Sequence, residues 1–92
     1  MSYSYQREKP RLFTEDGMAM VLAIRDAATA LLKVAGAVRA EKLLIGPGDS
    51  WVMMAAIDYL VERGELIRVT EKYQTPGQHE VFIAGPKLLK GG

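Results

Sequence analysis

The sequence predicts one small α+β domain in which three helices precede a two-stranded β-hairpin. Apolar residues recur at three- and four-residue spacing over residues 15–34, and an almost wholly apolar helix follows further along the chain. After Gly64 the period of the apolar pattern changes from about 3.6 to 2, which indicates strands. A chain of 92 residues has room for a single hydrophobic core.

The first helix is expected over about residues 15–34. The hydroxyl of Thr14 can cap its start, and Gly36 is a plausible stop. One apolar stripe is typical of an amphipathic helix: Val21, Ile24, Ala28, Leu31 and Ala35.

Two further helices are expected before the hairpin. Residues 37–45 have the pattern of a shorter helix, and the Gly-Pro-Gly segment at residues 46–48 ends it because proline cannot continue a helix. The third helix begins at Asp49 or Ser50 and runs to Arg63. It is apolar on nearly all sides, which is typical of a helix buried on more than one face.

The hairpin is expected to consist of strands at residues 66–72 and 79–84, joined by a loop over residues 73–78. Pro76 and Gly77 in this loop suit the central positions of a type II turn. Two apolar residues share a face in each strand: Ile67 with Val69, and Val81 with Ile83.

The two ends of the chain are expected to lie outside the folded domain, which would span residues 13–85. Residues 1–12 read as a flexible basic arm with a net charge of +2. Residues 86–92 read as a basic tail, also with a net charge of +2.

Several classes of function are excluded by composition. The chain has no cysteine and one histidine, His79, so neither a disulfide framework nor a multi-histidine zinc site is expected. No nucleophile, base or phosphate loop is recognisable, so we expect a non-enzyme without cofactor or metal. No signal peptide or membrane-spanning stretch is present, so the expected location is the cytoplasm and no membrane partner is expected.

The passage from the third helix into the hairpin resembles the winged helix-turn-helix superfamily. The resemblance covers about residues 15–84 and implies a DNA-binding regulator like those of bacteria and prophages. The residues that carry it follow a Leu-x-x-x-Gly-x-Leu-x-Arg pattern: Ile57, Leu60, Gly64, Leu66, Ile67 and Arg68.

The charges favour a particular mode of DNA contact. Residues 49–65, which include the third helix, carry a net charge of −3 and lack the usual base-reading side chains, so this helix should be repelled from a groove. Contact with double-stranded DNA is therefore expected through the β-hairpin, which would be the wing, and through the basic arm and tail at the two ends of the chain. The alternative is that these cations only increase solubility. The candidate residues are Arg68, Lys72, Gln74, Gln78, Arg7, Lys9 and Arg11.

A second hypothesis makes the third helix a protein-interaction surface. Tryptophan and tyrosine are favoured anchors of interfaces, and a homodimer or an adaptor would cover such a surface. The candidate residues are Trp51, Val52, Ala55 and Tyr59. Alternatively, the chain covers this surface itself, either with the N-terminal arm or with Leu88 and Leu89 of the tail.

Overall fold

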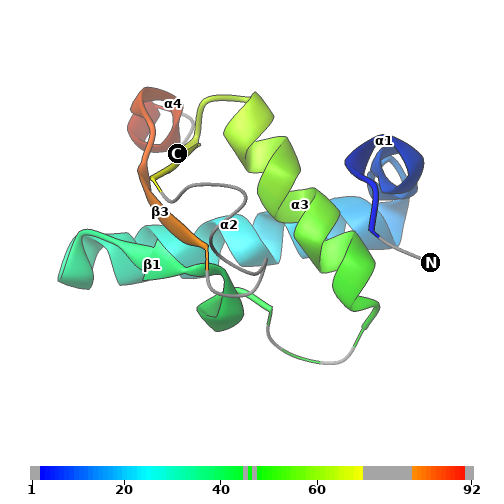
Figure 1. Cartoon of the computed structure of the whole chain (residues 1–92), viewed down its shortest axis with the longest axis horizontal. Coiled ribbons are helices and arrows are strands. Elements are labelled where there is room, and N and C mark those ends of the chain that lie inside the picture. Colours follow the sequence, from blue (N-terminus) through cyan, green and yellow to red (C-terminus); the bar gives the residue numbers. More distant parts are fainter. Residues whose placement is uncertain (1–2, 45, 47, 70–79, 91–92) are drawn as a thin grey trace.

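The computed structural model describes residues 3–44, 46, 48–69 and 80–90. This part of the chain contains four α-helices, two 3-10 turns and a three-stranded antiparallel sheet, so the predicted α+β class is confirmed. In Figure 1, α3 crosses in front of α2, with α1 on one side and β3 and α4 on the other. The helices are α1 (Tyr5–Glu8), α2 (Glu15–Ala35), α3 (Ser50–Glu62) and α4 (Pro86–Lys90). The 3-10 turns are η1 (Lys9–Leu12) and η2 (Ala40–Lys42). The strands are β1 (Val38–Arg39), β2 (Leu66–Arg68) and β3 (Val81–Ala84).

Helix α2 is the longest element and begins and ends where local signals predict. The Thr14 hydroxyl accepts a hydrogen bond from the backbone N–H of Gly17 at 3.0 Å. At the other end Gly36 has a left-handed backbone with φ of 78°, and its N–H donates to the carbonyl of Leu32. Within the described residues, no helix has both the length and the apolar character needed to cross a membrane.

The predicted second helix over residues 37–45 is wrong. Val38 and Arg39 instead form strand β1 and pair with Phe82 and Val81 of β3. The backbone N–H of Ala40 then donates to the carbonyl of Glu80 at 2.8 Å, before the short turn η2. Pairing with a strand more than forty residues away thus overrides the local helical pattern. The periodicity of the sequence cannot reveal such a pairing, because it reports only on neighbouring residues.

Helix α3 leads into the hairpin as predicted. The Asp49 carboxylate caps α3 by accepting from the N–H of Trp51, and Gly64 has the expected left-handed backbone with φ of 78°. Strands β2 and β3 pair antiparallel, with Ile67 opposite Ile83. Strand β2 turns Leu66 into the core, whereas Ile67 and Val69 are exposed. The predicted loop over residues 73–78 lies outside the described residues.

The sheet contains one more strand than the predicted hairpin. Its order is β1-β3-β2, so β3 lies in the middle and pairs with both neighbours. Phe82 at the centre of β3 is fully buried, while Val81 and Ile83 on the opposite face are partly buried. The inward face of β3 is therefore the one that carries Phe82.

Both predicted flexible ends are folded where the structure describes them. The segment before α2 forms α1 and η1, and within it Glu8 is 4% exposed and Leu12 is 0% exposed. The segment after β3 forms α4, whose Leu88 is buried in the same core. The expected division at residues 13 and 85 is therefore wrong for these segments, because each supplies a leucine that completes the core.

A candidate binding groove between α1, α3 and the sheet

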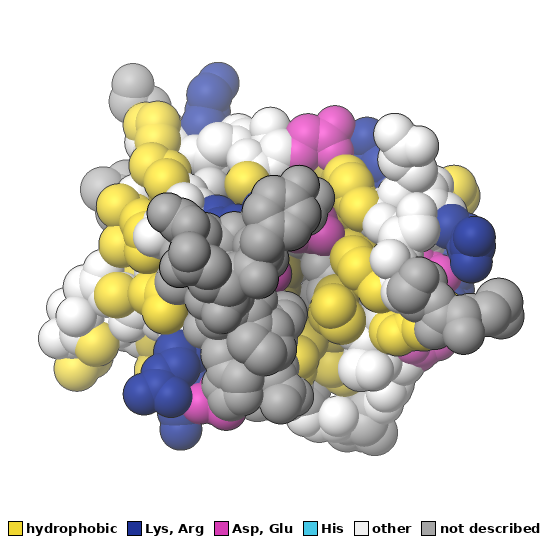
Figure 2. Space-filling model, in the orientation of Figure 1, with side chains coloured by type: hydrophobic (Ala, Val, Ile, Leu, Met, Phe, Trp, Pro, Cys, Tyr) yellow, Lys and Arg dark blue, Asp and Glu magenta, His cyan; other side chains and the backbone are white. Residues whose placement is uncertain are grey.

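A groove of about 850 Å³ opens between the N-terminal segment, α3 and the sheet. Its floor is apolar and includes Met54, Ile57 and Phe82, while its walls carry tyrosines and charged residues. Figure 2 shows hydrophobic side chains along α3, right of centre, interrupted by acidic ones. The lining residues come from three separate parts of the chain: Tyr3, Ser4, Tyr5, Gln6, Lys9, Ala40, Met54, Ile57, Asp58, Val61, Glu62, Arg68, Glu80 and Phe82.

One wall of the groove is a polar network centred on Asp58 and Arg68. The hydroxyl of Tyr3 donates to Asp58 Oδ2 at 2.6 Å, and Arg68 Nη2 donates to Asp58 Oδ1 at 2.6 Å. Arg68 Nε also donates to a carboxylate oxygen of Glu80, and its guanidinium lies 5.3 Å from the centre of the Phe82 ring. This network ties the N-terminal segment, α3 and two strands together along the groove.

The opposite end of the groove holds a second cluster around Glu62. The Tyr5 hydroxyl donates to one carboxylate oxygen of Glu62, and Lys9 Nζ donates to the other at 2.9 Å. Lys9 also lies 5.6 Å from the centre of the Tyr5 ring. Since Asp58 and Glu62 are one helical turn apart, the two clusters follow the same side of α3.

Burial and the hydrogen bonds of the two clusters shift the pKa values of these groups. Burial is the main cause that raises the pKa of the Tyr3 phenol, and the hydrogen bond to Asp58 is the next. Burial, followed by the hydrogen bond to Glu62, likewise raises the pKa of the Tyr5 phenol. The hydrogen bond from Tyr5, followed by that from Lys9, lowers the pKa of Glu62. Burial alone would lower the pKa of Arg68, but the hydrogen bond to Asp58 and the charge of Glu80 raise it overall. At neutral pH both phenols therefore stay protonated and act as donors, not as nucleophiles or bases.

Among the predicted DNA-contacting residues that the structure describes, Arg68, Lys9 and Arg11 are bonded to carboxylates of the chain and do not form a free basic surface. Arg68 and Lys9 bond to carboxylates in the groove, as described above. Arg7 is exposed and forms no ion pair among the described residues, whereas Lys72, Gln74 and Gln78 lie outside them.

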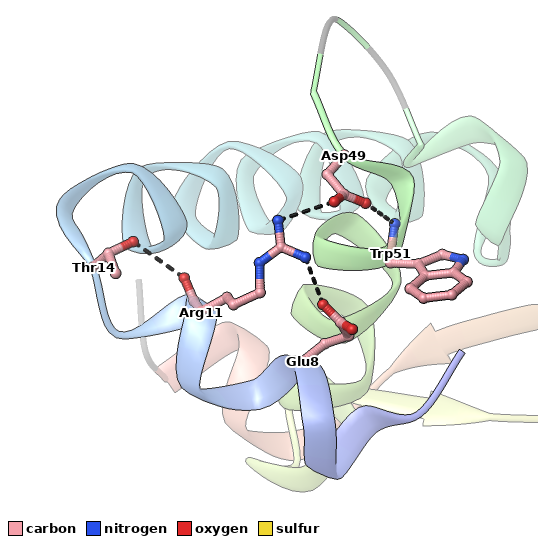
Figure 3. Close-up of polar contacts among 5 residues, drawn as sticks. All are labelled: Glu8, Arg11, Thr14, Asp49 and Trp51. Carbon is pink, nitrogen blue, oxygen red and sulfur yellow. Dashed lines mark hydrogen bonds and ion pairs between the residues drawn. The ribbon is translucent and has the colours of Figure 1, made fainter. Parts of the chain in front are cut away.

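Arg11 is also occupied within the chain. Its guanidinium bridges Glu8 and Asp49, with Nη1 at 2.6 Å from Glu8 Oε1 and Nη2 at 2.9 Å from Asp49 Oδ2 (Figure 3). The pKa of Asp49 is lowered mainly by the hydrogen bond from the backbone N–H of Trp51 and next by the hydrogen bond from Arg11. Arg11 thus fastens η1 to the start of α3, which is a structural role.

The predicted protein-interaction residues also separate into two groups. Val52 and Ala55 are buried in the core, whereas Trp51 and Tyr59 are partly exposed. The Tyr59 ring meets the Phe13 ring edge-on, with 5.6 Å between their centres. The N-terminal segment packs on α3. This packing agrees with the alternative that the chain's own N-terminal segment covers the third helix.

Sequence reasoning missed most of the groove. The four-residue spacing of Asp58 and Glu62 puts them on one helix face, but the sequence predicts residues 1–12, which include Tyr3 and Tyr5, as a flexible arm. The sequence does contain one feature that could have indicated the groove. Tyr3 and Tyr5 are two residues apart and can donate hydrogen bonds, and the apolar third helix carries two carboxylates that can accept them. In the described residues, no three histidine, aspartate or glutamate side chains are arranged to hold a metal ion.

Comparisons of this chain with models of protein families, with curated proteins and with solved structures found no match.

Proposed function

We propose that this chain is a non-catalytic, winged-helix-type module that binds a short segment of a partner protein in the groove between α1, α3 and the sheet. The observation that carries the proposal is the 850 Å³ groove with an apolar floor and ordered polar walls. A volume of this size lies within the range of about 300–1,000 Å³ that is usual for binding pockets.

The order of the elements supports the winged-helix part of the proposal. A long helix (α2) leads into a short strand (β1), and an apolar helix (α3) then precedes a hairpin whose strands complete a β1-β3-β2 sheet. Two features depart from a simple three-helix core: the turn η2 stands where a full second helix is expected, and α1 and η1 pack on α3.

The charges of the groove favour a protein segment over DNA. Three carboxylates (Asp58, Glu62 and Glu80) against two cations (Lys9 and Arg68) give the lining a net charge of −1. Binding to phosphates depends on cations that release counterions, and both cations here are already bonded to carboxylates. An occupant with apolar side chains for the floor and at least one lysine or arginine fits this lining best.

Selection from a displayed library of random short peptides tests the proposal. Peptides enriched on the wild-type protein should combine apolar and basic residues. They should bind the Met54→Lys variant at least about tenfold more weakly, because a cation then occupies the apolar floor. Val34→Lys is the matched control, since Val34 lies on α2 outside the groove and should leave binding unchanged.

The proposal fails if no peptide is enriched, or if the enriched peptides bind wild type and Met54→Lys equally well. Circular dichroism of both variants establishes that each remains folded.

Association with DNA through the wing and arms is the second candidate function. The winged-helix order of elements and the exposed cation at Arg7 favour it. Fluorescence anisotropy with a labelled duplex of random sequence distinguishes the two functions. Binding that weakens steeply with added salt, and less steeply in an Arg7→Ala variant, would favour DNA. No binding at low salt is the result expected from the groove.

A further inference from the structure

The three carboxylates of the groove differ in how easily a ligand can reach them. The side chains of Asp58 and Glu80 are 21% and 16% exposed, whereas that of Glu62 is 48% exposed. Asp58 and Glu80 share the guanidinium of Arg68, which links β2 to α3. A cation that replaced Arg68 would have to break both of these partly buried contacts at once. Glu62 is therefore the carboxylate of the groove that a positively charged ligand meets most readily.

The cation that pairs with Glu62 is held loosely. Lys9 Nζ donates to Glu62 Oε1 at 2.9 Å, and the side chain of Lys9 is itself 36% exposed. An exposed ion pair of this kind contributes little to stability, because water screens the charges and a long side chain must be ordered. Glu62 is ionised at neutral pH, since the hydrogen bonds from Tyr5 and Lys9 lower its pKa. Displacing Lys9 thus costs little and leaves a negative charge to be neutralised.

The position of the Lys9 ammonium suits a guanidinium better than a second ammonium. It lies beside a carboxylate oxygen of Glu62 and 5.6 Å from the centre of the Tyr5 ring. A lysine of a ligand would only reproduce these two contacts, and Lys9 has the advantage of belonging to the same chain. An arginine can donate two hydrogen bonds to one carboxylate and also lay its planar group on an aromatic ring. Tyr5 can keep its own hydrogen bond, because each carboxylate oxygen accepts about two.

We infer that an arginine of the bound segment displaces Lys9 and pairs with Glu62, so that Glu62 determines a specificity for arginine over lysine. This inference rests on the proposed function, since it needs a protein segment in the groove. Lys9 is then an internal competitor, which neutralises Glu62 in the empty groove and moves into solvent when the segment binds. Ile57 and Val61 line the groove on the same stretch of α3, so apolar side chains near the arginine meet the floor.

Binding of matched peptides tests this pairing. A peptide enriched from the library on the wild-type protein is synthesised with arginine, lysine or the neutral analogue citrulline at its basic position. Dissociation constants are then measured by fluorescence anisotropy. The arginine peptide should bind wild type at least about fivefold more tightly than the lysine peptide, because it forms a second charge-assisted hydrogen bond. The citrulline peptide should bind at least about tenfold more weakly than the arginine peptide, because it carries no charge.

The variant Glu62→Gln tests the proposed determinant of specificity. Glutamine keeps an acceptor for the Tyr5 hydroxyl but removes the charge, so the arginine and citrulline peptides should bind this variant within about twofold of each other. Glu41→Gln is the matched control, because Glu41 is also exposed and paired with an arginine but lies outside the groove. It should leave the preference for arginine unchanged.

The variant Lys9→Gln tests the internal competitor. It should strengthen binding of the arginine peptide about two- to fivefold, because no cation of the chain then has to be displaced from Glu62. Lys33→Gln is the matched control, since Lys33 is exposed on α2 and does not line the groove. Circular dichroism establishes that all the variants are folded.

The outcomes separate this inference from the proposed function. If no peptide is enriched, both fail. If the enriched peptides contain no arginine, or bind Glu62→Gln as they bind wild type, the groove still binds a protein segment but the pairing with Glu62 is overturned. Weaker binding to Lys9→Gln would show that Lys9 contacts the ligand rather than competing with it, and would also overturn the inference.

Discussion

At the scale of single residues, Gly17 shows how closely the N-terminal segment packs on α2. A Cβ at this position would lie 2.2 Å from the carbonyl oxygen of Arg11 and 2.7 Å from Cα of Leu12. Both are backbone atoms that cannot move aside as a flexible side chain would. The absence of a side chain at Gly17 is therefore what allows η1 to lie against the first turn of α2.

We predict that Gly17→Ala destabilises the protein, although helix propensity alone favours alanine by about 1 kcal/mol. The overlap with the η1 backbone should outweigh this gain and cost about 1–3 kcal/mol net. Urea denaturation of the variant and the wild type measures the difference in free energy of unfolding. A Gly17→Ala variant as stable as the wild type would mean that η1 does not rest on α2 as described.

Asp49 links the stability of the protein to pH. Its pKa is lowered below the ordinary value of 3.8, first by the hydrogen bond from Trp51 N–H and then by Arg11. The folded state therefore binds this proton less readily than the unfolded state. The resulting stabilisation is fully present above about pH 3.8 and is lost as the pH falls through the lower pKa of the folded state.

We predict that the stability difference between wild type and Asp49→Asn shrinks as the medium is acidified. Asparagine also caps helices well, so this variant removes the titrating charge and the ion pair with Arg11 but keeps the cap. Urea unfolding from neutral pH to about pH 3 follows the difference between the two proteins. A difference that stays constant over this range would show that Asp49 titrates alike in the folded and unfolded states.

At the scale of elements, the segment formed by α1 and η1 belongs to the core rather than to a mobile arm. We predict that Leu12→Ala lowers the free energy of unfolding by about 2–5 kcal/mol, because Leu12 is fully buried between η1 and its neighbours. Arg7→Ala in the same segment should change it by less than about 0.5 kcal/mol, since Arg7 is exposed. Thermal denaturation compares the two. Equal effects would contradict the packing of this segment.

The elements that the sequence predicts correctly are those encoded by neighbouring residues. In helices α2 and α3, each cap and each terminal glycine lies next to the helix end that it marks, and the apolar periodicity lies within the helix itself. Strand β1 has no such local signal, since its two residues become a strand only by pairing with β3. The turn η2 and the helix α1 are likewise short, and helices of this length owe their stability to packing.

The groove is harder to predict for the same reason. Tyr3 and Asp58 are 55 positions apart in the chain, and Tyr5 and Glu62 are 57 apart. Each residue alone is an ordinary surface side chain, and only the packing of α1 on α3 brings them together. The charge on α3 was visible in the sequence, but the partners that neutralise it were not.

At the scale of the whole molecule, both ends of the chain complete one core. A domain of this size buries a smaller share of its surface than a larger domain does, so each additional leucine contributes appreciably to stability. Leu12 from η1 and Leu88 from α4 join the same buried cluster as the apolar faces of α2 and α3. The N-terminal segment, the helices and the sheet should consequently be stable only together.

We therefore predict that the protein unfolds in a single cooperative transition. Trp51 is the only tryptophan and stands in the first turn of α3, so its fluorescence reports on that helix, whereas far-UV circular dichroism is dominated by the longer α2. The two signals should give the same midpoint in urea. Leu88→Ala should lower both midpoints equally, although α4 is remote in sequence from Trp51, because removing its buried side chain costs about 2–5 kcal/mol of the shared stability. If α4 instead detached on its own, Leu88→Ala would leave the fluorescence midpoint unchanged, and the core would consist of separable parts.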